Sequence, residues 1–214
     1  GISYSFRKAF NSAWDPIVIE GCADSALNLL RRTTDCEIEL NFTISRKGLE
    51  ALREGKCELA GFNFPKSSTN NSKAFGTFGH LLTKNNGLIF FATRLQGLAV
   101  APGNPKKIYS ILDIASRKAK FINRREGTGT RILFDQMLDV LAVKPEEIEG
   151  YNDISDTQFF TAVQIASGKV DVGLCTANVA KENGLDFIPL AKEVYYLAAD
   201  EKFLETAKAK KFIQ

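Results

Sequence analysis

Residues 121–133 read Phe121-Ile122-Asn123-Arg124-Arg125-Glu126-Gly127-Thr128-Gly129-Thr130-Arg131-Ile132-Leu133. This order of residue types predicts a short strand, a turn with two glycines and two threonines, and an amphipathic helix. The first backbone N–H groups of a helix have no partner within the helix, and the helix dipole favours negative charge there. Small residues let an anion approach, and hydroxyl and guanidinium groups can add donors. The stretch therefore predicts an anion site at a helix start, the simpler alternative being that Thr128 only caps the helix.

The same turn does not match the common nucleotide-binding motifs. Gly127 and Gly129 lack the third glycine of the dinucleotide fingerprint. Gly55-Lys56 is followed by Cys57 rather than by serine or threonine, so it is not a P-loop. The expected ligand is therefore a small anion rather than a nucleotide held by its phosphates.

Two parts of the chain resemble each other. Residues 48–61 and residues 161–173 each predict a helix that ends at Gly-Lys, followed by a short apolar strand with an acidic residue at its second position. A strand-turn-helix unit precedes each of them, at residues 17–30 and at residues 121–133. Two such pairs in the same order indicate two α/β lobes of the same kind, facing each other.

Strands and helices alternate along the chain, which is typical of a parallel sheet covered by helices on both faces. We expect strands near residues 16–20, 36–42, 57–62, 88–101, 119–123, 170–174, 186–188 and 194–199. We expect helices near residues 24–33, 46–54, 109–117, 129–141, 157–167, 176–183 and 201–213. Residues 66–73, which are rich in serine, threonine and asparagine, predict a surface loop.

Composition excludes several classes of protein. The chain has 214 residues, 44% of them hydrophobic, and a formal net charge of only +3, which does not indicate a nucleic-acid surface. No run of 18 apolar residues predicts a membrane span, and no leader opens the sequence. The four cysteines form no Cys-x-x-Cys pair. Cys36 and Cys57 should begin strands on either side of the Ile17 strand, which would place them too far apart to form a disulfide. Unpaired cysteines favour a cytoplasmic location, or a periplasmic one if a leader was removed.

Catalysis has little support in the sequence. His80 is the only histidine, and the sequence contains no Gly-x-Ser-x-Gly motif whose serine it could activate as a nucleophile. Acidic pairs such as Glu146-Glu147 follow a proline and suit the first turn of a helix. We therefore expect a binding protein that is not an enzyme, with no catalytic residue, no metal and no cofactor.

Several motifs together resemble a known family. Residues 94–105 are similar to the inter-lobe strand of type II periplasmic-binding-protein folds, and residues 121–131 are similar to the strongest motif of the molybdate-binding-protein-like domains within that fold. Further matches occur at residues 150–151, 156–157, 166–174 and 184–190, and the resemblance runs from about Pro16 to Ala199. In bacteria and archaea these substrate-binding domains are often fused to helix-turn-helix regulators or to molybdopterin-biosynthesis domains.

The resemblance implies an α/β fold of the type II periplasmic-binding-protein kind. Two doubly wound lobes would be joined by two crossing strands, with a ligand cleft between them. Lobe 1 would comprise residues 1–95 and 196–214, and lobe 2 residues 96–195. A ligand held by both lobes would favour their closure.

Ligands of the family sit where strand ends and helix starts converge. The matching positions of this chain are Cys22, Ser45 and Asn63 in lobe 1, and Arg125, Thr128, Gly129, Thr130, Thr157 and Gln158 in lobe 2. Asp24 would repel an anion, so we expect it to cap its own helix. The chain departs from the family's Gly-Ser-His-Asp and Thr-His patterns, since it has Cys22-Ala23 at the first turn and Gln158 after Thr157.

The resulting hypothesis is a domain that binds a small oxyanion such as molybdate or tungstate and acts as a ligand sensor or carrier. One alternative is the effector-binding domain of a transcription regulator that recognises a small organic acid, which a roomier cleft lined by Phe159 and Phe160 would favour. Another is a domain associated with an enzyme of the molybdopterin pathway. The expected partners are a small anionic ligand and a fused DNA-binding or enzymatic domain, with no membrane partner and with oligomerisation open.

Overall fold

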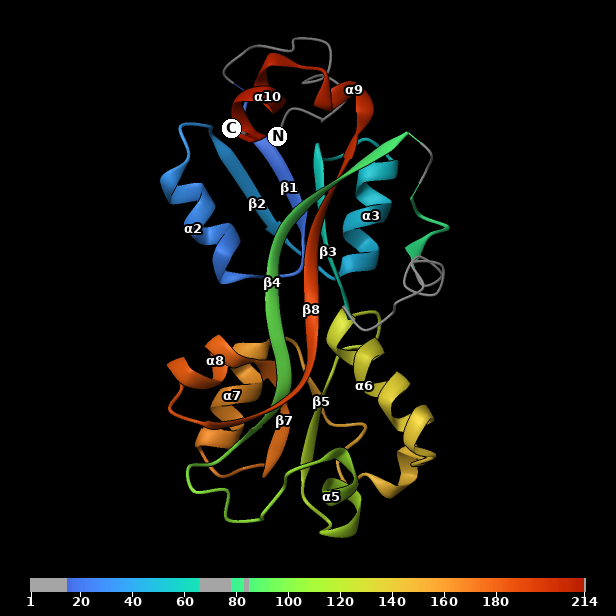
Figure 1. Ribbon diagram of the computed structural model, residues 1–214, viewed down its shortest axis with the longest axis vertical. Coiled ribbons are helices and arrows are strands. Elements are labelled where there is room, and N and C mark those ends of the chain that lie inside the picture. Colours follow the sequence, from blue (N-terminus) through green and yellow to red (C-terminus); the bar gives the residue numbers. More distant parts are fainter. Residues whose placement is uncertain (1–14, 66–77, 83–84, 214) are drawn as a thin grey trace. The chain divides into compact units, whose positions relative to one another are not determined.

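The computed structural model describes residues 15–65, 78–82 and 85–213 (Figure 1). The chain divides into two compact units. Unit 1 comprises residues 1–63, 70–92 and 195–214, and unit 2 comprises residues 64–69 and 93–194. The lobe boundaries expected from the family resemblance stay a prediction, and the loop predicted at residues 66–73 lies outside the described residues.

Unit 1 is built on a sheet whose first three strands are parallel. Its strands run in the order β2-β1-β3-β8-β4, and β1 pairs in parallel with both β2 and β3. This order confirms that the Ile17 strand separates the strands that follow Cys36 and Cys57, and all four cysteines are free. The elements are β1 (Ile17–Gly21), α2 (Ser25–Thr33), β2 (Ile38–Phe42), α3 (Ser45–Arg53), β3 (Leu59–Pro65), one end each of β4 (Asn86–Val100) and β8 (Asp186–Asp200), α9 (Glu201–Leu204) and α10 (Ala207–Ile213).

Helices α2 and α3 flank the strands of unit 1 (Figure 1). Ile17 and Ile19 of β1 share one core cluster with Leu27 of α2, and Phe212 of α10 packs against that cluster. Helix α3 lies close to β1: a Cβ atom added to Gly48 would be only 2.8 Å from the carbonyl oxygen of Glu20. A glycine at this position therefore lets the helix pack directly on the strand.

Unit 2 repeats this plan around strands in the order β8-β4-β7-β5-β6. Strand β5 pairs in parallel with β6 and β7, whereas β4 pairs antiparallel with β7. Strands β4 and β8 each continue from one unit into the other. The remaining elements are α5 (Ile111–Ser116), β5 (Phe121–Arg124), α6 (Gly129–Leu141), the 3-10 turn η2 (Pro145–Glu147), β6 (Ile154–Ser155), α7 (Gln158–Ala166), β7 (Val172–Thr176) and α8 (Ala177–Glu182).

Alternate residues of the unit 2 strands enter two separate cores. Phe121 and its neighbours in β4 and β7 pack with side chains of α5 and α6, including Phe134. Ile122, the next residue of β5, packs instead with Ala162 and Ile165 of α7 and with α8. Because successive strand side chains point to opposite faces, both faces are buried and the strands read as continuous apolar runs. Figure 1 shows α6 on one side of these strands and α7 with α8 on the other.

The structure corrects two of the expected elements. The strands predicted at residues 186–188 and 194–199 form one strand, β8, because Pro189 and the polar pair Lys192-Glu193 interrupt the apolar pattern without interrupting the strand. The helix predicted at residues 201–213 is two helices, α9 and α10. Thr206 lies between them, where its hydroxyl accepts a hydrogen bond from Ala209 N–H at 3.1 Å and so begins a new helix.

Candidate functional site

The start of α6 is built as the sequence predicts. Gly127 has a φ of +79°, a left-handed conformation that suits glycine, and turns the chain from β5 into the helix. Thr128 is the N-cap, since its hydroxyl accepts from Arg131 N–H at 3.3 Å and donates to the Arg125 carbonyl at 2.8 Å. The N–H groups of Gly129 and Thr130, the first two helical residues, cannot bond within the helix. The helix therefore presents two backbone donors, while the Thr128 hydroxyl is occupied by the cap.

The Thr130 hydroxyl joins three elements of unit 2. Its oxygen lies 2.5 Å from Gln96 Nε2 of β4 and 3.3 Å from Gln158 Nε2 of α7. Gln158 is held at its other end, because its Oε1 accepts from Thr176 N–H at 2.8 Å. A hydroxyl has two acceptor lone pairs and one proton, so with both amides oriented as assigned, the two amide donors leave the Thr130 proton for a further acceptor. The arrangement therefore makes Thr130 a hydrogen-bond donor beside the two backbone donors.

Two guanidinium groups near this helix start, those of Arg125 and Arg131, are paired with carboxylates. Arg125 is exposed and pairs with Asp156, with Nε at 3.0 Å from Oδ1. Arg131 pairs with Asp135 at 2.8 Å and lies 4.3 Å from the centre of the Tyr151 ring. Burial opposes the charge of Arg131, but its hydrogen bonds to Tyr151 and Asp135 outweigh burial and raise the pKa of Arg131. The donors that face a ligand are thus mainly neutral, and Arg125 would need to leave Asp156 to add its charge.

Helix α7 begins with a second cap. The Thr157 hydroxyl accepts from Phe160 N–H at 3.0 Å, so this hydroxyl is committed to the cap as the Thr128 hydroxyl is. Gln158, the first helical residue, is the one that reaches the α6 start. Of the unit 2 candidates, the structure therefore brings Thr128, Gly129, Thr130 and Gln158 together. Thr157 caps α7 and Arg125 pairs with Asp156, so neither contacts this group directly. We call the cluster of Gln96, Thr128, Gly129, Thr130 and Gln158 the α6 site.

In unit 1, two candidates lie next to each other after β1 and at the start of α3. Cys22 Sγ is 3.1 Å from Ser45 Oγ, and Tyr195 Oη donates to the Cys22 carbonyl at 2.8 Å. Asn63 is buried in β3 at 2% exposure. Asp24 accepts from Ala26 N–H at 2.8 Å as the N-cap of α2, which confirms its expected capping role.

Gln96 was missed by the sequence analysis. It is fully buried in β4, and its register partner in β7 is Thr176, the residue whose N–H holds Gln158. The available signal was a long polar side chain within the apolar run from Leu95 to Val100. A buried amide at such a position needs hydrogen-bond partners, which marks it as a candidate site residue.

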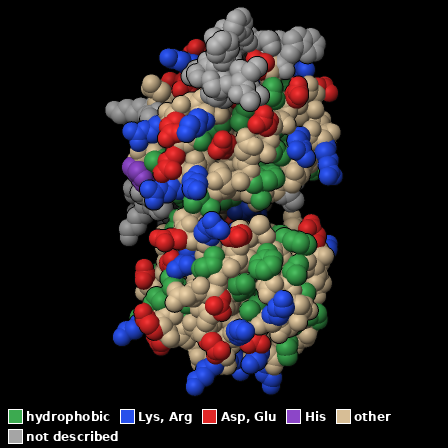
Figure 2. Space-filling model, turned by 180° about the vertical axis from the view of Figure 1, so that it is seen from behind, with side chains coloured by type: hydrophobic (Ala, Val, Ile, Leu, Met, Phe, Trp, Pro, Cys, Tyr) green, Lys and Arg blue, Asp and Glu red, His purple; other side chains and the backbone are tan. Residues whose placement is uncertain are grey.

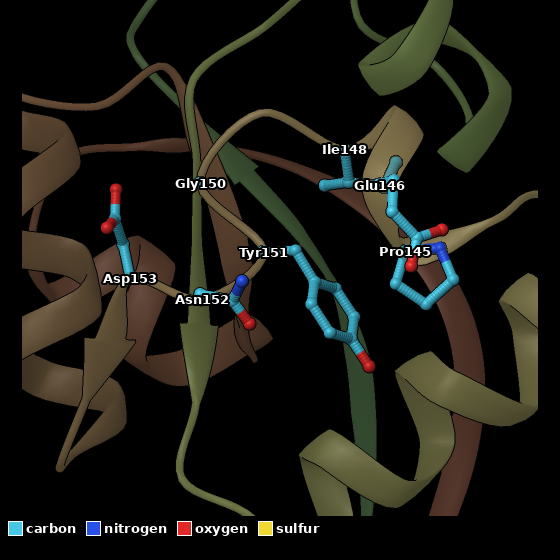
Figure 3. Close-up of a pocket in the computed structure, with 7 residues that line it drawn as sticks. All are labelled: Pro145, Glu146, Ile148, Gly150, Tyr151, Asn152 and Asp153. Carbon is cyan, nitrogen blue, oxygen red and sulfur yellow. The ribbon is translucent and has the colours of Figure 1, made fainter.

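A hollow of about 360 Å³ lies at residues 145–153 of unit 2 (Figure 3). In Figure 3 the Tyr151 ring points away from Asp153. The Tyr151 hydroxyl donates to Asp135 at 2.9 Å, and burial together with this hydrogen bond raises the pKa of Tyr151. The carboxylates of Glu146 and Asp153 in its lining would repel an anion, so this hollow is a poor match for the expected ligand.

The described residues also bear on other chemistries. Among residues 15–65, 78–82 and 85–213, no three His, Cys, Asp or Glu side chains cluster as metal ligands. Burial raises the pKa values of Cys57 and Cys175 to about 12, so both thiols stay protonated at neutral pH. None of the helices in this described part of the chain is long and apolar enough to cross a membrane.

Comparison with known proteins identifies the family. Residues 27–214 match the model of the PBP superfamily domain. The uncharacterised protein YvgK of Bacillus subtilis (strain 168) is 32% identical over 169 residues, which cover 79% of this chain. The matched region spans 55% of the length of YvgK.

Solved structures share the fold at low sequence identity. One is a proposed phosphate ABC transporter substrate-binding protein with bound phosphate from Clostridium perfringens, at 17% identity and a TM-score of 0.68, covering 93% of this chain and 91% of that one. Another is the effector-binding domain of QuiR in complex with shikimate, at 13% identity and a TM-score of 0.65, covering 92% of this chain and 93% of that one. These matches confirm the mixed α/β periplasmic-binding-protein-like fold, and with the family match they show that the chain is a ligand-binding domain of the PBP superfamily.

Proposed function

We propose that this domain binds a small oxyanion at the α6 site and acts as a ligand sensor or carrier rather than as an enzyme. The observation that carries the proposal is the Thr130 hydroxyl, which receives two amide donors and so keeps its proton for an acceptor beside the free N–H groups of α6. Neutral, preorganised donors at a helix start suit an anion without ion-pair chemistry. Molybdate and tungstate belong to this ligand class, and so does the phosphate named for a structural neighbour.

The second candidate is the effector domain of a transcription regulator that recognises a small organic acid. The support is the shikimate complex of a domain with the same fold. A carboxylate would use the same donors as an inorganic oxyanion, but the rest of the molecule needs an apolar wall. Phe160 lines a hollow of about 560 Å³ with Ile154 and Val170, and that lining contains no residue of the α6 site. We therefore favour the inorganic oxyanion. We also propose a cytoplasmic location and a fused DNA-binding or enzymatic partner domain.

A thermal-shift panel tests the proposed function. We expect at least one of phosphate, sulfate, molybdate and tungstate to raise the unfolding temperature, whereas neutral sugars do not. At about 100 times its dissociation constant, a specific ligand should add roughly 2.7 kcal/mol to the free energy of unfolding. Shikimate and simple carboxylic acids belong in the same panel. A response confined to them would replace the oxyanion with the organic acid, and no response to any anion would refute both.

Two threonine variants separate ligand binding from capping. Thr130→Val removes the proposed hydroxyl donor and should weaken anion binding by about 1.5–3 kcal/mol, because a hydrogen bond to a charged group is lost. Thr128→Val removes the N-cap and should cost about 0.5–2 kcal/mol of stability with a much smaller change in affinity.

Isothermal titration well below the unfolding temperature measures the affinities of these two variants, and chemical denaturation measures their stabilities. Thr130→Ser keeps the hydroxyl and serves as the matched control. If Thr130→Val binds the anion as tightly as the parent chain, the anion site lies elsewhere.

A further inference from the structure

A second hollow of unit 2, with a volume of about 560 Å³, is lined by residues in and next to β5, β6 and α7. It shares no residue with the α6 site, so the proposed oxyanion leaves it unused. Its volume falls within the range of roughly 300–1,000 Å³ that is usual for small-molecule sites. We call it the α7 hollow, and the lining residues that decide its chemistry are Lys120, Asp153, Phe160, Gln164, Lys169 and Val170.

One part of the α7 hollow is apolar. Ile122 and Val170 are only 5% and 8% exposed and belong to the core that packs against α7. Phe160 stays 46% exposed, because other residues form the buried side of α7. An aromatic ring that is half in solvent, beside apolar side chains, gains free energy when an apolar group of a ligand covers it.

Polar groups lie one helical turn away from Phe160. Gln164 is four residues further along, so both side chains lie on the same face of α7. The Gln164 carbonyl accepts from Lys169 N–H at 3.1 Å, which holds Lys169 at this end of the helix. Lys120 is held beside the same segment, because its N–H donates to Asp171 Oδ2 at 2.8 Å and its carbonyl accepts from Asp171 N–H at 2.8 Å. One end of the hollow therefore carries two lysines and a side-chain amide.

The ammonium groups of these two lysines have no carboxylate partner within the described part of the chain. Asp171, which lies next to both in the structure, is engaged by the Lys120 N–H group and by Lys106 Nζ at 3.6 Å. Two unpaired ammonium groups attract an anionic group, and a carboxylate offers them two acceptor oxygens.

Asp153 adds the opposite charge to the hollow. The register of β5 and β6 pairs Asn123 with Ile154, so Asp153 is level with Ile122 and lies on the same face of the sheet. In Figure 3 its carboxylate points away from the Tyr151 ring. A ligand with negative charge alone would be repelled by this carboxylate, whereas a ligand that also carries an ammonium group would be attracted by it.

We infer that the α7 hollow is a second ligand site, which takes a small zwitterion with an apolar side chain, that is, an apolar α-amino acid. The carboxylate of the ligand meets Lys120 and Lys169, its ammonium group meets Asp153, and its side chain covers Phe160. This inference does not depend on the proposed function, because the two sites have no residue in common.

An NMR titration of the full chain with L-phenylalanine tests the inference. We expect the backbone amide signals of residues 120, 164 and 169 to shift and to saturate. N-acetyl-phenylalanine lacks the ammonium group and phenylalaninamide lacks the carboxylate, so each should bind about 10-fold more weakly. Serine keeps both charges but lacks the apolar side chain, and should also bind about 10-fold more weakly.

Exposed residues of the hollow can be replaced with little risk to the fold. Phe160→Ala should weaken the binding of L-phenylalanine about 10-fold, because it removes the apolar wall. Phe159→Ala, at the neighbouring exposed phenylalanine outside the lining, is the matched control and should bind as the parent chain does. Lys169→Met should weaken binding about 3-fold, with the exposed Lys181→Met of α8 as its control.

The outcomes distinguish this site from the α6 site. Unshifted amide signals at residues 120, 164 and 169, or equal affinities of Phe160→Ala and Phe159→Ala, would overturn the inference. Equally tight binding of N-acetyl-phenylalanine would overturn the zwitterion as the ligand class. Shifts centred on Gly129 and Thr130 would place the amino acid at the α6 site and would overturn the inference as well. Failure of every oxyanion to stabilise the fold would remove the proposed function and leave this inference standing.

Discussion

Replacing Arg94 by methionine is expected to lower the free energy of unfolding by about 3–5 kcal/mol. Arg94 of β4 pairs with Glu193 of β8 at 3.0 Å, and their side chains are 10% and 0% exposed. The substitution leaves the fully buried Glu193 carboxylate without this cation, and removing one member of a buried ion pair costs far more than removing one member of an exposed pair. Urea denaturation of the parent chain and the variant measures the difference.

An exposed ion pair of the same type provides the control. Arg46 and Glu50 of α3 are paired at 3.0 Å, but their side chains are 63% and 39% exposed. Arg46→Met should therefore cost only about 0.3–0.5 kcal/mol. The double variant Arg94→Met with Glu193→Leu should recover part of the loss, because it removes both buried charges. Equal effects of Arg94→Met and Arg46→Met would contradict the importance of burial for this pair.

Alanine at Gly150 is the second substitution with a large expected effect. Gly150 has a φ of +86°, and a Cβ atom there would lie 2.0 Å from the carbonyl oxygen of Phe121 in β5. The left-handed conformation costs a non-glycine residue about 1–2 kcal/mol, and the clash with backbone adds about 1–3 kcal/mol. Thermal or urea unfolding should therefore show a loss of about 2–5 kcal/mol.

Gly168 separates the two contributions. Its φ is +71°, and a Cβ atom there would meet nothing within 4 Å, so Gly168→Ala carries only the conformational cost. The difference between the two variants measures the clash with Phe121. If Gly150→Ala is no less stable than Gly168→Ala, the backbone at residue 150 moves away at little cost, and the hollow in Figure 3 should change shape with it.

The exposed hydrophobic side chains of unit 2 show the limit of a sequence pattern. Phe159 and Phe160 are 62% and 46% exposed, and Figure 2 shows hydrophobic side chains lying open among charged ones. From the sequence these two residues were candidates for the wall of a ligand site. Their position at the start of α7 leaves them largely in solvent, because Thr161, Ala162 and Ile165 form the buried side of that helix.

The sequence alone determined the features that depend on near neighbours. The alternation of apolar strands and helices predicted the α/β fold, and the Gly-Thr-Gly-Thr turn predicted the start of α6, with capping by Thr128 as the simpler alternative to ligand binding. Asp24 as a cap followed in the same way. In each case the interacting groups are two or three residues apart, so their types and spacing fix the contact.

Tertiary structure decided which side chains meet across the chain. Gln96 reaches Thr130 over 34 positions, and Gln158 reaches it over 28. Arg94 meets Glu193 over 99 positions. No local pattern encodes these pairs, because they depend on the order of strands and on the approach of helix starts from different parts of unit 2. The local sequence therefore predicts where α6 begins. The donor role of the Thr130 hydroxyl and the burial of the Gln96 amide oxygen arise only when β4, α6 and α7 pack together.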